Sequence, residues 1–143
     1  MELKAALRWV YFVLAWGVVA ELGLQFYFAA YGAFSTGRED FAGHSANANL
    51  VVVVMLAALV VAGISAATGG LGWARVIGHI VLPVLVVVQF VLVTIGEEGG
   101  PLPALLGLHG LNGVVMLVLS LWLGLGAVRL LRTGSSGRKE WSP

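Results

Sequence analysis

The stretch "LVVVVMLAALVV", Leu50–Val61, decides the fold class of this protein. It lies within a longer segment, Phe41 to Ala67, that contains no charged residue. In water its valines would favour a β-strand. In a bilayer, however, only helices and closed barrels satisfy every backbone hydrogen bond, and this run lacks the alternating polarity of a barrel strand. The stretch therefore predicts a transmembrane helix.

The rest of the chain carries the same signal. Its 143 residues are 59% hydrophobic and 10% charged, whereas a soluble domain is roughly 25% charged. Apolar segments at about 8–31, 41–67, 73–95 and 103–131 each exceed the roughly 20 residues that a spanning helix needs. Glycine, proline and charged residues separate the segments. We expect an all-α, up-down bundle of four transmembrane helices covering residues 1–132.

Charged residues and cysteines limit the function further. The net charge of +1 gives no indication of nucleic-acid binding, and the chain has no cysteine, which excludes disulfides, thiolate metal sites and covalently attached c-type haem. Arg38 lies on one side of the predicted membrane, and the other basic residues lie on the opposite side, together with both termini. These residues are Lys4, Arg8, Arg75, Arg129, Arg132, Arg138 and Lys139. The positive-inside rule then predicts that both termini are cytoplasmic, with residues 133–143 as a flexible basic tail.

Polar side chains recur at one depth in the outer half of all four predicted helices. Asn47 and Asn112 each follow a histidine by three residues, so each shares a helix face with that histidine. Polar groups within a membrane are rare and usually face the bundle interior. The layer comprises Gln25, His44, Asn47, Gln89, His109 and Asn112.

Two histidines in such a layer suggest a bound haem. His44 and His109 belong to the second and fourth helices, which are diagonal partners in an up-down bundle, and together they are the candidate iron ligands. Gly110 and Gly113 would leave room for a flat ring, and Gln25, Gln89 or a backbone carbonyl would fix the imidazole tautomers. Interhelical hydrogen bonding without any cofactor explains the same residues equally well.

Glu21 and His79 lie outside this layer. Glu21 is one turn before Gln25, near the middle of the membrane, where it is either a neutral hydrogen-bonded carboxyl or a proton carrier. His79 lies in the cytoplasmic half of the third helix. We expect it to form local hydrogen bonds, with Ser65, Thr68 or Ser120 as partners, rather than to bind a metal.

The motifs also resemble those of an uncharacterised, domain-of-unknown-function family of small bacterial four-span membrane proteins. That family carries QFxxAxxGxF, an early His, a late Gln and LHxxNG. The matching positions here are Gln25, Phe26, Ala29, Gly32, Phe34, His44, Gln89, Leu108, His109, Asn112 and Gly113. The resemblance implies a four-span topology and an ordered polar layer, and no activity. We expect the chain to lie in a bacterial inner membrane. In architecture and helix order the chain is also similar to four-helix b-type cytochromes.

These observations favour a small electron-transfer module that binds one haem b between the second and fourth helices, near the extracytoplasmic face. No independent catalytic activity is expected. A cofactor-free accessory subunit of a larger membrane complex is one alternative, and a quinone- or lipid-binding protein is another. Besides membrane lipids, we expect the partner to be a second copy of the chain or a larger membrane complex.

Overall fold

The computed structural model describes residues 3–35, 41–68, 70–98 and 103–136. These residues form four α-helices: α1 (Leu3–Phe34), α2 (Ala42–Ala67), α3 (Trp73–Glu98) and α4 (Pro103–Ser136). Each is long and apolar enough to cross a membrane, so the prediction of an all-helical chain with four candidate spans is confirmed. Pro83 lies within α3, and the helix continues through it.

The first and last helices of the chain, α1 and α4, are longer than their predicted spans. α1 begins at Leu3 and α4 ends at Ser136. At 1.5 Å per residue the 34 residues of α4 measure about 51 Å, which exceeds the roughly 30 Å of hydrocarbon. The helix thus continues through residues 133–136, which belong to the predicted flexible tail. Residues 137–143 lie outside the described part of the chain.

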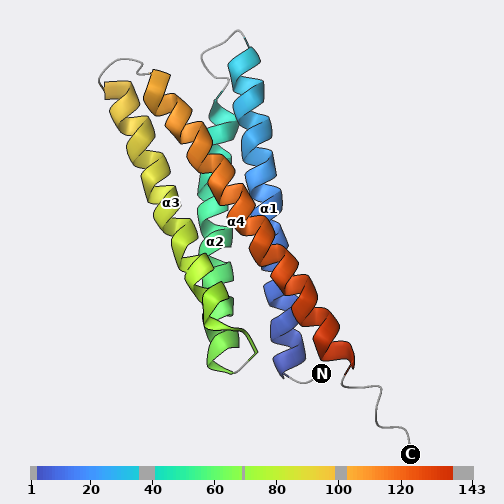
Figure 1. Cartoon of the computed structure of the whole chain (residues 1–143). Coiled ribbons are helices and arrows are strands. Elements are labelled where there is room, and N and C mark those ends of the chain that lie inside the picture. Colours follow the sequence, from blue (N-terminus) through green and yellow to red (C-terminus); the bar gives the residue numbers. More distant parts are fainter. Residues whose placement is uncertain (1–2, 36–40, 69, 99–102, 137–143) are drawn as a thin grey trace, which may run out of the picture.

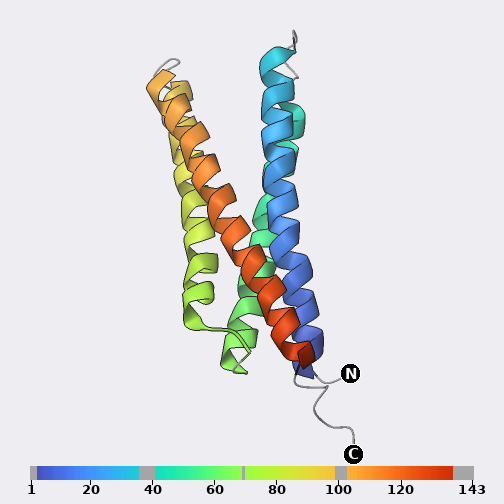
Figure 2. The same ribbon diagram turned by 45° about the vertical axis from the view of Figure 1, so that its right-hand side comes forward.

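The helices form two antiparallel hairpins, α1–α2 and α3–α4, that pack against each other. α1 contacts α2 and α4, and α3 contacts α2 and α4, whereas α2 and α4 are diagonal to each other as predicted. Figures 1 and 2 show that the start of α1 and the end of α4 lie at the same end of the bundle, where α4 crosses toward α1. Toward the opposite end the two hairpins diverge in both views.

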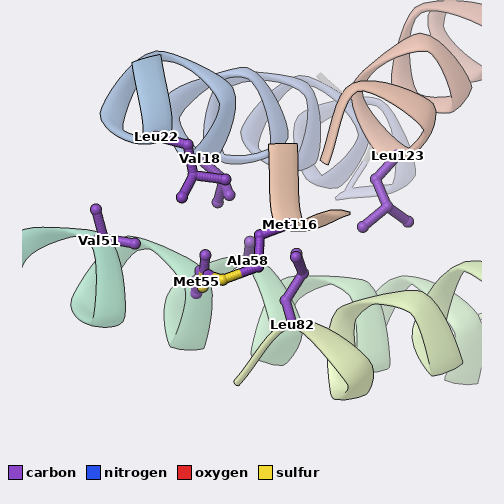
Figure 3. Packing of buried hydrophobic residues seen from close by; sticks show 8 residues of the cluster. All are labelled: Val18, Leu22, Val51, Met55, Ala58, Leu82, Met116 and Leu123. Carbon is purple, nitrogen blue, oxygen red and sulfur yellow. The ribbon is translucent and has the colours of Figure 1, made fainter. Parts of the chain in front are cut away.

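A dry apolar core fills the middle of the bundle, where the hairpins meet. Its buried members come from all four helices (Figure 3), and they are Val18, Leu22, Val51, Met55, Ala58, Leu82, Met116 and Leu123. Small and large side chains of this core are both fully buried, such as Ala58 and Leu123. Close packing of side chains of different size is typical of protein interiors. The core therefore closes the bundle below the end at which the hairpins diverge.

Candidate functional site

In the first hairpin, Gln25 of α1 connects to two residues of α2. Its Nε2 amide donates to the backbone carbonyl of His44 at 3.0 Å, and its Oε1 accepts from the Nδ2 of Asn47 at 2.8 Å. The same Nδ2 also lies 3.1 Å from the backbone carbonyl of Glu21. The His44 ring returns to α1, with Nδ1 3.2 Å from the Gln25 carbonyl. We call this set of bonds the first clamp.

The second hairpin repeats this arrangement with different residues, which we call the second clamp. The Nε2 of Gln89 donates to the His109 carbonyl at 2.9 Å, and Nδ2 of Asn112 donates to Oε1 of Gln89. Asn112 also donates to the Leu85 carbonyl at 2.9 Å. The Nδ1 of His109 lies 3.5 Å from the Gln89 carbonyl. Each side-chain-to-main-chain bond of the first clamp therefore has a counterpart in the second clamp.

The two clamps reveal an internal repeat that the sequence also carries. Gln89 lies 64 positions after Gln25, and His109 and Asn112 lie 65 positions after His44 and Asn47. The offset of 64 also relates Phe26 to Phe90, Trp9 to Trp73 and Gly32 to Gly96. Similarity at a constant offset is the mark of a repeated structural unit. This signal is present in the sequence, but it is visible only when the two halves of the chain are aligned with each other.

The clamps bring the two histidines together across the interface between the hairpins. The centroids of the His44 and His109 rings are 6.2 Å apart, and the ring planes make an angle of 57°. Both rings line a cavity of about 450 Å³ in the half of the bundle where the hairpins diverge. The structure therefore brings His44 and His109 together at one cavity, and their role as iron ligands stays a prediction.

The walls of this cavity are mostly apolar. Phe26 of α1 and Phe90 of α3 line it, and three core residues, Leu22, Val51 and Met116, line it as well. A methyl group added at Gly110 would meet no atom within 4 Å, so this glycine leaves the cavity open. A methyl group at Gly113 would instead lie 3.3 Å from the Phe26 ring, so Gly113 allows α1 to approach α4 closely.

The remaining polar residues of the predicted layer have different positions. Gln25 and Gln89 line the cavity, but their amides also bond between helices. Asn47 is buried, and its amide is directed to α1. The Oε2 atom of Glu21 is buried and has no hydrogen-bond partner among the described residues.

A second buried polar contact lies in the other half of the bundle. The Nε2 of His79 is 3.2 Å from the hydroxyl of Tyr11, and both side chains are almost completely buried. Ten residues of α3 separate His79 from Gln89, which is about 15 Å along the helix. His79 is thus a local hydrogen-bonding residue, as predicted, but its partner is Tyr11. Thr68 and Ser120 instead bond to carbonyls of their own helices.

Tyr11 is the residue that sequence analysis missed. It lies 68 positions from His79, in a segment with other aromatic residues, and nothing in the pattern singled it out. The rotation of α1 about its axis decides which of these aromatic residues faces His79, and the sequence does not give that rotation.

Comparison with models of protein families, with curated proteins and with solved structures gives no match for this chain. The resemblance drawn from the short motifs therefore stays a prediction.

Proposed function

We propose that this protein is a small membrane cytochrome of the b type, in which His44 and His109 hold one haem between the two hairpins. The observation that carries the proposal is the pairing of the two imidazoles at 6.2 Å across the cavity. Two imidazole–metal bonds of about 2.0 Å, plus the half-width of each ring, add up to roughly 6 Å. The spacing therefore fits two axial ligands of one iron.

The surroundings of the rings support the same assignment. In each clamp Nδ1 faces a backbone carbonyl, which favours the tautomer with hydrogen on Nδ1 and a lone pair on Nε2. To bind a metal, His44 would exchange the Gln25 amide, which lies 3.2 Å from its Nε2 in this structure. A donor set of two imidazoles suits a macrocycle that brings four nitrogens of its own better than it suits a free zinc or copper ion. The cavity also falls within the size range of ordinary ligand sites.

A haem bound here would supply reversible one-electron transfer. The protein residues would hold and orient it: the histidines bind, and the clamps fix the ring directions. Phe26 and Phe90, which line the cavity, would contact the haem, and the apolar core below would limit its exposure to water, which influences the reduction potential. The chain would act as an electron carrier or as the haem-bearing subunit of a larger membrane complex.

The basic residues support an orientation in a bacterial inner membrane. Lys4 and Arg8 lie in the first turns of α1, and Arg75 lies in the first turn of α3. Arg129 and Arg132 lie toward the end of α4, and these helix ends form the end of the bundle that carries both termini (Figure 1). By the positive-inside rule this end is cytoplasmic, so the cavity is near the extracytoplasmic face. Fluorescence of a carboxy-terminal fusion to green fluorescent protein, which folds only in the cytoplasm, tests this orientation.

Absorbance of the detergent-purified protein tests the haem assignment. We expect the sharp reduced α band of a low-spin haem with two imidazole ligands. His44→Ala and His109→Ala should each remove the low-spin spectrum, whereas His79→Ala should retain it because His79 belongs to the other half of the bundle. A colourless protein that gains no such band on addition of haemin would overturn the proposal. In that case quinone binding or a purely structural role in a complex remains.

A further inference from the structure

The two clamps differ at the Nε2 atoms of their histidines, and the second clamp also has a 3.9 Å contact from Asn112 Nδ2 to the Met116 sulfur that the first lacks. In the first clamp the Nε2 of His44 lies 3.2 Å from the Nε2 amide of Gln25. In the second clamp the Gln89 amide bonds to the His109 carbonyl, and Nε2 of His109 has no hydrogen-bond partner among the described residues. The internal repeat is thus broken at the atom that would bind a metal.

This contact has a defined direction. Because Nδ1 of His44 faces a carbonyl that can only accept, the ring hydrogen is assigned to Nδ1, and Nε2 carries the lone pair. The amide of Gln25 can only donate, so it donates to that lone pair. A metal needs the same lone pair. The Gln25 amide and a metal therefore compete for His44, whereas no group of the described chain competes for His109.

We propose that His109 is the permanent axial ligand and that His44 is an exchangeable one, whose release is favoured by the Gln25 amide. The inference rests on the proposed haem site. When His44 leaves the iron, its Nε2 gains the hydrogen bond to Gln25, so the released state is stabilised. A released His109 would gain no such hydrogen bond, because no amide of the described chain faces its Nε2. A small external ligand should consequently enter on the His44 side of the ring and displace that histidine.

Gln25 is accordingly a positioning residue that decides which coordination position opens. Its other bonds need not change when His44 binds or leaves the iron. The Gln25 amide would still donate to the His44 carbonyl, and its Oε1 would still accept from Asn47. The site would thus combine electron transfer with binding of a small neutral ligand such as carbon monoxide. One hydrogen bond should alter the balance between the bound and released states about two- to tenfold.

The repeat supplies a matched pair of variants, Gln25→Met and Gln89→Met. Both remove an amide that bonds to a histidine carbonyl and accepts from an asparagine, so their structural losses are equivalent. Only Gln25→Met removes an amide from a histidine Nε2. In titrations of the reduced haem protein with carbon monoxide, the affinity should fall about two- to tenfold in Gln25→Met relative to Gln89→Met.

Equal affinities in the two variants, or a larger fall in Gln89→Met, would overturn the inference. Haem content and helical circular dichroism are measured first. If the methionine variants do not fold, Gln25→Glu and Gln89→Glu replace them, because they keep the oxygen that accepts from asparagine and remove the amide nitrogen.

A second measurement separates this inference from the haem assignment. In haem-free protein with ¹⁵N-labelled histidine, the Nε2 resonance of His44 should shift in Gln25→Met, and that of His109 should not shift in Gln89→Met. If wild-type protein binds no haem but these shifts appear, the proposed function fails and the difference between the clamps stands. Matching shifts in both variants would disprove the difference.

Discussion

Asn47 and Asn112 each connect two helices through a single amide nitrogen. In each clamp this nitrogen reaches a glutamine side chain and a backbone carbonyl one turn earlier on the neighbouring helix. Lipid offers no water to replace such bonds. The asparagines therefore stabilise the hairpins, and they hold the glutamines that in turn orient the histidines.

Asn47→Ala and Asn112→Ala should each lower the free energy of unfolding by about 1 kcal/mol, the usual value of interhelical polar contacts in membranes. The losses should be similar because the two sets of bonds are similar. Unfolding in mixed micelles with increasing dodecyl sulfate, followed by circular dichroism, measures them. Asn49→Ala is the control, since Asn49 is exposed and its one bond among the described residues lies within its own helix, to the Ser45 carbonyl at 3.5 Å. An equal loss in this control would contradict the assigned role.

The depth of each polar residue was predictable from the sequence, but its partner was not. Depth follows from counting residues along a helix at 1.5 Å each, which put Gln25, His44, Gln89 and His109 in one layer. The partner depends on how each helix is rotated about its axis. For that reason the contact between His79 and Tyr11, and the different environments of the two histidine rings, appear only in the structure.

At the level of the helices, three glycines of α4 spaced three residues apart have different surroundings. Gly110 and Gly113 both line the cavity, and Gly113 also lies against the Phe26 ring of α1. Gly107 has open space around it and is not a cavity residue. The three glycines therefore differ: Gly107 has open space around it, Gly110 lines the cavity, and Gly113 contacts α1 as well.

Gly110→Leu should fill the cavity and reduce haem binding roughly tenfold or more, because an added side chain in an occupied site forces its surroundings to move. The helix itself should not suffer, since leucine favours helices more than glycine does. Haem content per protein, measured by absorbance after purification, tests this. Gly107→Leu adds the same side chain one turn away and should leave the content unchanged. Equal binding by both variants would show that the cavity is not the haem site.

At the level of the whole molecule, the bundle consists of two similar hairpins with complementary apolar faces. Positions related by the repeat differ in size: Met55 corresponds to Ser120, and Ala58 corresponds to Leu123, all of them buried. Because the two differences run in opposite directions, two copies of either hairpin should produce crowding at one of these positions and a void at the other. The four-helix architecture was predictable from composition and segment length. The preference of each hairpin for the other hairpin over a second copy of itself was not predictable. It depends on the volumes of buried side chains, and only the structure shows which positions are buried.

The complementary faces predict that the protein can be divided between its hairpins. Fragments 1–69 and 70–143, produced together, should purify as a complex and bind low-spin haem, because transmembrane hairpins can form separately and then associate. Neither fragment by itself should give that spectrum, since each supplies only one of the two cavity histidines. Affinity purification through a tag on one fragment, followed by absorbance, measures both results. With His109→Ala in the second fragment the complex should still form but lack the low-spin haem. Failure of the intact fragments to associate, or a low-spin spectrum from the first fragment alone, would disprove the complementarity of the two hairpins.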